Sequence, residues 1–425
     1  ADLALVDVRV VDVAAGELRP PAPVLVREGR IVAVAPAGEI DARRASRVVA
    51  GEGRYLVPGL WDLHVHTLWD DALADTFLPL FVAHGVTGVR DMGGLPRLAS
   101  AWPAQIESGE LLGPRIVAAG PILDGQPPIH PEVSVAVADA AEARAAVRGI
   151  DRQGFAFVKV YTMLSREAYF AAADEATRLG LSFAGHSSGR VSPEEAARAG
   201  QRSIEHLANG QPEPARIDPR CGEAGGCGEL LEVFAAHSTW QVPTLVLLRG
   251  KAFPEDPAHA DESRLRYLPP VAREELQAAR RRRIEGAPPA RQASAREEWP
   301  LYLDLVARMA DAGVPLGAGT DTGVLFGVPG FSLHDELELL VQAGLTPGQA
   351  LRAATVGAAA LLGLDGETGA VEEGRAADLV LLDENPLERI GATRAIAGVV
   401  RAGRYLDREA LDRLLEGVEG AAASG

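Results

Sequence analysis

The chain has 425 residues, of which 47% are hydrophobic, and a formal net charge of −17 at pH 7. This length and apolar content allow a large buried core, either as one large barrel with an appendage or as two or three domains. The acidic balance argues against nucleic acid or an anionic membrane as a partner. No apolar run approaches the roughly 20 residues that a membrane-spanning helix needs.

The first segment, residues 1–58, is rich in valine and is punctuated by glycine-containing turns, as expected for short strands. Residues 367–406 show the same pattern of short apolar runs separated by turns. The two segments together predict a small β-sandwich domain built from both chain ends. A C-terminal helix at about 407–418, followed by a tail, completes the predicted domain 407–425.

Residues 59–366 alternate between strand-like and helix-like segments. The expected strands are 60–66, 85–91, 115–120, 155–161, 181–186, 202–206, 239–244 and 314–321. The expected helices are 138–149, 166–179, 193–199 and 303–312. Eight strands alternating with helices indicate an α/β fold of the (β/α)8 TIM-barrel type. A doubly wound sheet is the rival fold, but the chain lacks an obvious glycine-rich phosphate turn after an early strand.

The stretch from about 250 to 300 fits neither pattern, since it contains the polar run REELQAARRRRIEG. We expect an exposed helical insertion between the seventh and eighth strands. A solvated hairpin that faces another subunit is favoured over a lid.

Cys221 and Cys227 stand in the run CGEAGGC. They form either a small disulfide loop in an exported protein or two free thiols in a cytoplasmic one. The chain begins at Ala1 rather than at methionine, as after processing or trimming. Together these features slightly favour a periplasmic or secreted location.

Histidines and one aspartate fall at the ends of the predicted strands. His64 and His66 are two residues apart in a strand, so both imidazoles point to one side and can reach one metal ion. His186, His206 and Asp321 end three further strands, at the face of a barrel where catalytic residues collect. Any one of these residues has an ordinary structural explanation, but their joint placement indicates a metal centre.

Lys159 lies inside the apolar strand FAFVKVY and is one of only two lysines, with Lys251, among 42 basic residues. Burial lowers the pKa of a lysine and makes its amine nucleophilic. Such an amine can take up carbon dioxide to give a carbamate that bridges two cations. A structural lysine paired with a carboxylate is the alternative.

The runs GLWDLHVH, VKVYT, FAGHSSG, SIEHLANG and GTDTG resemble, in this order, the binuclear amidohydrolase superfamily. The resemblance is strongest to the imidazolonepropionase-related branch, which contains Xaa-Pro dipeptidases and amidases of N-acyl amino acids such as ochratoxin. It implies two divalent metal ions, expected to be zinc from the ligand types, held by His64, His66, Lys159 in carboxylated form, His186, His206 and Asp321. The run SSGR after His186 departs from the dipeptidases of that branch.

The resemblance further implies hydrolysis of an amide bond in a dipeptide or N-acyl amino acid by a metal-bridging hydroxide, with Asp321 as general acid and base. His130 is expected to donate to the scissile carbonyl oxygen. Tyr161 and Arg190 are expected to contact the substrate, Arg190 through a carboxylate. The superfamily often forms oligomers, so we expect a homo-oligomer that acts on a small molecule.

Three alternatives stay open at this point. A phosphotriesterase or lactonase uses a similar six-ligand set, and activity on an ester but not an amide would favour it. A mononuclear deaminase does not need Lys159 and usually has a glutamate close behind the histidine of strand five, where this chain has Ser187. A non-enzymatic barrel would have lost ligands, but all six are present.

Overall fold

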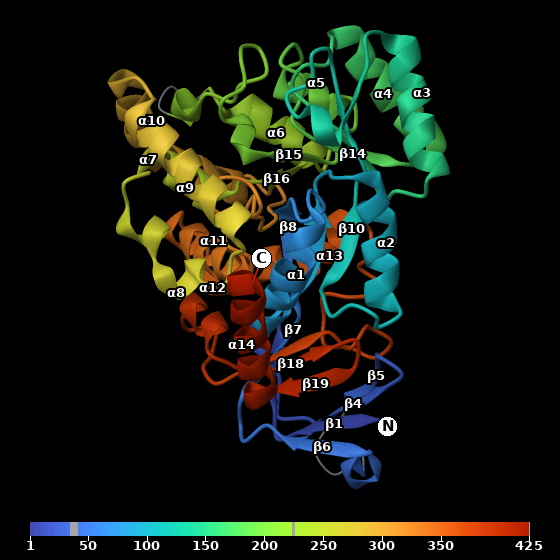
Figure 1. Ribbon diagram of the computed structural model, residues 1–425. Coiled ribbons are helices and arrows are strands. Elements are labelled where there is room, and N and C mark those ends of the chain that lie inside the picture. The colour runs from blue at the N-terminus through green and yellow to red at the C-terminus, as the bar shows by residue number, and fades with distance from the viewer. Residues whose placement is uncertain (35–40, 223–225, 425) are drawn as a thin grey trace.

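The computed structural model describes residues 1–34, 41–222 and 226–424. Strands from both ends of the chain gather at one end of the molecule, and alternating strands and helices form the rest (Figure 1). None of the helices within these residues is both long and apolar enough to cross a membrane. The end of the predicted strand-like segment near residue 36 and the final residue 425 lie outside the described ranges.

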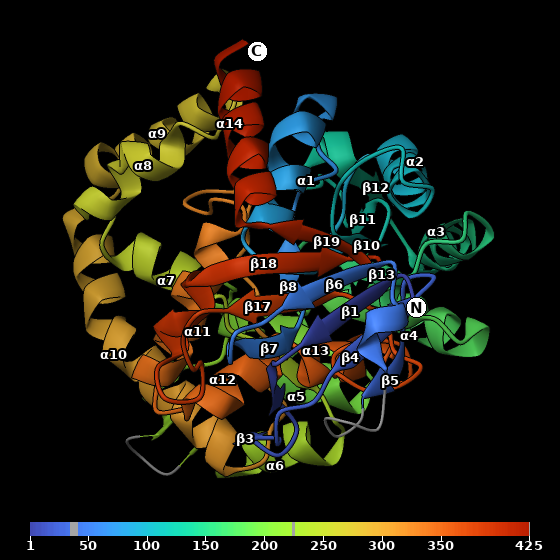
Figure 2. The same ribbon diagram turned by 90° about the horizontal axis from the view of Figure 1, so that it is seen from below.

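The strands at the two chain ends form two sheets, ordered β5-β4-β1-β6 and β19-β18-β17-β7-β2-β3. They are β1 Leu3–Val6, β2 Arg9–Asp12, β3 Glu17–Leu18, β4 Val24–Arg27, β5 Arg30–Val34, β6 Arg47–Ala50, β7 Tyr55–Pro58, β17 Leu379–Leu382, β18 Ile396–Arg401 and β19 Arg404–Asp407. β17 pairs antiparallel with β7, so segments more than 300 residues apart share one sheet. A separate apolar core that includes Leu5, Leu56 and Leu379 lies between the sheets. Figure 2 shows these strands from below.

Parallel strands form the centre of the molecule, in sheets ordered β10-β9-β8 and β12-β11-β13-β14-β15-β16. They are β8 Leu60–Val65, β9 Val86–Asp91, β10 Arg115–Ala118, β11 Ile122–Asp124, β12 Ser134–Ala136, β13 Phe157–Val160, β14 Ser182–Gly185, β15 Ser203–Glu205 and β16 Trp240–Val242. Seven of these strands coincide with predicted ones. Parallel strands joined by helices confirm the α/β class.

Helices connect and cover these strands. They are α1 Ala74–Ala83, α2 Pro96–Glu107, α3 Ala140–Arg152, α4 Arg166–Leu179, α5 Pro193–Arg198, α6 Gly228–Ala236, α11 Phe331–Gln342, α12 Pro347–Ala353 and α13 Val356–Leu362. Asp139 and Ser165 cap the first turns of α3 and α4 by accepting backbone N–H groups. The final helix α14 Arg408–Ser424 is longer than predicted and packs against α1.

The predicted eighth strand, 314–321, has no regular strand in the structure. Instead, Leu316 bridges to Gln241 of β16 and Thr322 bridges to Val65 of β8, both in parallel. The segment therefore lies between the first and last strands of the parallel set. Glycine permits this close approach, because a Cβ at Gly319 would stand 2.6 Å from Cγ1 of Val242 and 2.9 Å from the nitrogen of His64.

The predicted insertion is helical. It consists of α7 Leu245–Ala252, α8 Glu262–Leu265, α9 Pro270–Glu285 and α10 Pro289–Asp311, and α10 also takes in the helix expected at 303–312. In Figure 2, α8, α9 and α10 form an arc on the outside of the molecule. Residues 271–282 of α9 contribute most of the wall of a cavity of about 680 Å³, which Trp69 and Gly323 also line. Gly323, in the wall of this cavity, is two residues beyond Asp321 in the chain.

Cys221 and Cys227 are joined by a disulfide, the first of the two alternatives that the sequence left open. Residues 223–225, between the two cysteines, lie outside the described residues.

Candidate metal-dependent active site

The structure brings all the predicted histidine ligands together. Their rings form one closed series of aromatic contacts with centroid distances of 4.2–5.6 Å. The series runs through His64, His66, Trp69, His130, Tyr161, His186 and His206. These side chains lie at or after the ends of five parallel strands, β8, β11, β13, β14 and β15, and surround one common space.

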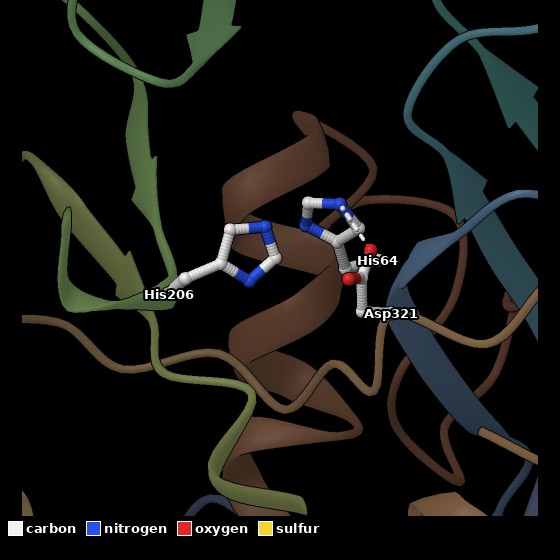
Figure 3. A group of neighbouring side chains, drawn as sticks. All are labelled: His64, His206 and Asp321. Carbon is white, nitrogen blue, oxygen red and sulfur yellow. Dashed lines mark ion pairs between the residues drawn. The ribbon is translucent and has the colours of Figure 1, made fainter. Parts of the chain in front are cut away.

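Asp321 meets the histidines at this space. Its Oδ1 lies 3.2 Å from Nε2 of His64 and 3.4 Å from Nε2 of His66. Ligand atoms of His64, His206 and Asp321 all lie within 4.8 Å of one another, and Figure 3 shows His206 facing the other two from a separate strand end. His206 and Asp321 have left-handed backbones, with φ of 57° and 61°. Such strain in non-glycine residues is concentrated at functional sites.

His64 is held by a buried carboxylate. Its Nδ1 lies 2.7 Å from Oε2 of Glu205, and Arg90 donates to both oxygens of Glu205. Burial raises the pKa of Glu205, but Arg90 and the hydrogen bond with His64 outweigh it and lower this pKa to about 2. Glu205 is therefore an acceptor, so the proton of His64 sits on Nδ1 and its Nε2 carries a lone pair.

In each of the other three histidines, Nδ1 also lies against a protein group. Nδ1 of His66 lies 3.3 Å from the carbonyl oxygen of Gly93. Nδ1 of His206 lies 2.7 Å from Oγ1 of Thr244, a hydroxyl that itself donates to Pro243. Nδ1 of His186 lies 2.9 Å from Oγ1 of Thr162. With each Nδ1 occupied by a protein partner, Nε2 is the nitrogen that stays available in every ring.

These residues fit divalent metal ions. Nε2 of His64 is buried and has no hydrogen-bond partner within the described residues, although the Asp321 carboxylate is close to it. Two lone-pair acceptors at this distance repel each other unless a cation or proton stands between them. Imidazole nitrogens with a carboxylate are the donor set that Zn²⁺, Mn²⁺ or Co²⁺ accept.

Lys159 lies on β13 with 1% of its surface exposed. Its Nζ is 5.5 Å from the centre of the Tyr161 ring, and no hydrogen bond or ion pair of Lys159 occurs within the described residues. Burial lowers the pKa of Lys159 to about 8. Gly185 makes room for this side chain, since a Cβ there would stand 2.8 Å from Cδ of Lys159.

Of the expected substrate contacts, two lie among the predicted ligands and the third is exposed. His130 and Tyr161 lie together, with Tyr161 Oη 3.3 Å from Nε2 of His130, and the Tyr161 ring stacks on His186 at 4.2 Å. Arg190 is exposed, and no hydrogen bond from its guanidinium occurs within the described residues.

Sequence reasoning missed the residues that orient the ligands. Glu205 directly precedes His206, and Trp69 follows His66 by three residues, so adjacency to a predicted ligand was the available signal. Thr162 follows the predicted ligand Lys159 by three residues, so it carried the same signal, whereas Thr244 follows β16 by two residues, with no predicted ligand near it in the sequence.

Arg90 and Asp91 are adjacent on β9 but do not pair with each other. In an extended strand they point to opposite sides, so Arg90 reaches Glu205, whereas Asp91 accepts from the backbone of Thr67 and Leu68.

The fold and this site define a metal-dependent hydrolase of the α/β class. Residues 55–406 match the model of the Amidohydrolase family. Ochratoxinase from Aspergillus niger is 24% identical over 412 residues, which cover 82% of this chain and 75% of that protein. Imidazolonepropionase from Acidiphilium cryptum is 26% identical over 385 residues, covering 86% and 87%. The solved structure of a bottromycin amidohydrolase has a TM-score of 0.80 and 27% identity, and covers 99% of this chain and 90% of that one.

The chain belongs to the amidohydrolase family. It is a hydrolase of amide-type carbon–nitrogen bonds in small molecules. The family is metal-dependent, and His64, His206 and Asp321 form a cluster with the geometry to hold a metal ion.

Proposed function

We propose that this protein is a binuclear metal-dependent amidase or dipeptidase that cleaves an N-acyl amino acid or a dipeptide. The observation that carries the proposal is the shared orientation of four histidines, each with Nδ1 occupied and Nε2 available. One ion would be held by His64, His66 and Asp321, and the other by His186 and His206. Carboxylated Lys159 would bridge the two ions, which we propose to be zinc.

The proposal includes a closed (β/α)8 barrel over residues 59–366 and a β-sandwich domain of residues 1–58 and 367–406. The bridges of Leu316 to Gln241 and of Thr322 to Val65 support closure, because they link the last regular strand to the first. Ligands at the ends of β8, β13, β14 and β15 would then share the carboxyl face of the barrel.

Divalent ions at this site supply an activated water and polarise the amide carbonyl. Asp321 contacts His64 and His66 and would take the proton from the attacking water and pass it to the leaving amine. His130, held by Tyr161, would donate to the carbonyl oxygen as negative charge develops there. Trp69, between His66 and His130, would limit the access of bulk water.

The test combines metal analysis with activity on a panel of N-acyl amino acids, Xaa-Pro dipeptides and matched esters. We expect about two metal ions per chain, amide cleavage, and loss of both in Lys159→Ala. Lys159→Glu, which restores a carboxylate at this position, is the matched variant and should regain part of the metal content. Bicarbonate labelled with ¹³C should give a carbamate signal in the wild type only.

One metal ion per chain together with a fully active Lys159→Ala variant would exclude the carbamate bridge. Cleavage of the esters but not of the amides would favour the lactonase or phosphotriesterase alternative. The homo-oligomer stays a prediction, which sedimentation analysis would test.

A further inference from the structure

Glu336 of α11 is a fully buried carboxyl group that the proposed chemistry does not use. No lysine or arginine pairs with it in the part of the chain that the structure describes, whereas the adjacent Asp335 pairs with Arg264 and Arg394. Burial raises the pKa of Glu336 to about 8, against the opposing effect of two backbone N–H groups. A buried polar group is costly unless it is hydrogen-bonded, so the position of Glu336 needs an explanation.

Both oxygens of Glu336 contact the first turn of α7, the helix that packs against α11. Oε1 accepts from the backbone N–H of Leu245 at 2.9 Å, and Oε2 accepts from that of Val246 at 2.7 Å. These two residues begin the helix, and their N–H groups have no acceptor within it. The next two N–H groups of the helix are bonded to the carbonyl oxygen of Thr244. A side chain from another helix therefore caps the start of α7.

Thr244 occupies the N-cap position of α7 but does not cap it. Threonine is a favoured N-cap residue, because from an extended backbone its hydroxyl can accept from an N–H group of the first turn. Thr244 makes no such bond, and its backbone is left-handed, with φ of 48° and ψ of 51°. Its hydroxyl instead donates to the carbonyl oxygen of Pro243 at 2.8 Å and lies 2.7 Å from Nδ1 of His206.

This use of the hydroxyl determines the tautomer of His206. A threonine hydroxyl has one proton, and the carbonyl of Pro243 accepts it. Toward His206 the Thr244 oxygen is therefore an acceptor, which places the ring proton on Nδ1 and leaves a lone pair on Nε2. In the extended backbone of an ordinary N-cap, Thr244 would lose the conformation that brings its hydroxyl to His206.

We infer that Glu336 is a positioning residue for His206 and that it acts through Thr244. By capping α7 in place of Thr244, Glu336 stabilises the left-handed turn and leaves the hydroxyl free for the histidine. The N–H of Leu245, which Glu336 binds, belongs to the peptide bond that follows Thr244, so the connection from α11 to His206 is short. The inference rests on the proposed function, since it takes His206 as a metal ligand.

The experiment is a double-mutant cycle on zinc affinity, measured by competition with a chromogenic chelator. Thr244→Val removes the hydroxyl and keeps the shape of the side chain. Glu336→Met removes both acceptors and keeps the length of the side chain, and Glu336→Gln keeps one acceptor. Asp139→Ala, which removes the N-cap of α3, is the control for the loss of a helix cap alone. Melting temperatures establish that each variant is folded.

Thr244→Val should weaken zinc binding by about tenfold to hundredfold, the usual effect of removing the partner of a metal-binding histidine. Glu336→Met should weaken it by about tenfold, and Glu336→Gln by less. The double variant should lose no more than Thr244→Val alone, because both substitutions remove the same contact with His206. Asp139→Ala should melt at a lower temperature and bind zinc as the wild type does. Additive losses in the double variant, or wild-type zinc affinity in Glu336→Met, would overturn the inference.

A measurement without metal separates this inference from the proposed function. In the metal-free protein labelled with ¹⁵N-histidine, the ring nitrogen shifts report which nitrogen carries the proton, and His206→Gln assigns the signals of His206. The wild type should carry the proton on Nδ1, whereas Thr244→Val and Glu336→Met should show a mixture of tautomers. That result would support the positioning role even if the wild type cleaved no amide. A proton on Nδ1 in all three proteins would overturn the inference and leave the proposed metal centre intact.

Discussion

Glu205 on β15 and His64 on β8 come from strands 141 residues apart, and their side chains meet at 2.7 Å inside the protein. Arg90 of β9 forms an ion pair with the same carboxylate. Glu205 thus links three strands and fixes which nitrogen of His64 faces the metal site. This arrangement makes Glu205 a positioning residue with no contact to substrate.

We expect Glu205→Gln to weaken metal binding about tenfold to hundredfold, because a neutral amide orients and polarises His64 less well than a carboxylate. The measurement is competition for zinc against a chromogenic chelator. The substitution also leaves the buried Arg90 without its anion, which costs about 3–5 kcal/mol of stability.

The double variant Arg90→Met, Glu205→Gln separates the two effects, since it removes the uncompensated charge. Its stability should recover while its metal affinity stays low. Metal affinity equal to that of the wild type in Glu205→Gln would show that His64 needs no carboxylate partner.

Gly185→Ala should displace Lys159 from its position. The new Cβ would stand 2.3 Å from the carbonyl oxygen of Val160 and 2.8 Å from Cδ of Lys159, at a φ of 130° that L-residues rarely adopt. We expect a lower melting temperature and a loss of bound metal, measured by elemental analysis.

Gly180→Ala is the matched control for this substitution. Gly180 also has a positive φ, +74°, but a Cβ at this position would have nothing within 4 Å, so only the backbone strain of about 1–2 kcal/mol is expected. Equal metal content in the two variants would argue against a steric role of Gly185 toward Lys159.

Acid should destabilise the protein through a buried histidine that lies away from the metal site. His334 of α11 contacts Thr393 and the carbonyl of His84, and burial lowers its pKa from 6.5 to about 3. Below pH 6.5, His334 binds a proton in the unfolded chain but stays neutral in the folded protein. The free energy of unfolding therefore falls by up to about 1.4 kcal/mol per pH unit from pH 6.5 toward 3.

His334→Gln removes this titration and is the variant for the measurement, which is urea unfolding at pH 7 and pH 4.5. The variant should be less stable than the wild type at pH 7, and the gap should narrow or reverse at pH 4.5. A gap of the same size at both pH values would contradict the prediction.

Removal of metal ions by a chelator should abolish amide cleavage and lower the melting temperature. Ions that bind only the folded state stabilise it by about 2.7 kcal/mol at a free concentration one hundred times the Kd. Dialysis against Zn²⁺, Mn²⁺ or Co²⁺ should restore both, whereas Mg²⁺, which prefers an all-oxygen shell, should not. Full activity after complete metal removal would exclude the proposed site.

Local sequence patterns alone determined the fold class, the position of most strands and several of the candidate ligands. Hydrophobic strands and the alternation of strand with helix established the α/β class and the position of β8, β9, β13, β14 and β15. The imidazoles of His64, His66, His186 and His206 could be foreseen because residues at strand ends gather at one edge of a parallel sheet. An isolated lysine in an apolar strand likewise marked Lys159, since burial of an ammonium needs a reason.

Tertiary structure alone decided how these groups are held and reached. Glu205, Thr162 and Thr244 each contact Nδ1 of a histidine, and each comes from a part of the chain at least 24 residues from its partner. The segment 314–321 lies close to its neighbours because its glycines have no side chains in the way. The spacing of hydrophobic residues along the sequence does not predict such contacts. Lys251 came next to Asn209 only through the packing of α7, a contact that charge and spacing along the chain do not specify.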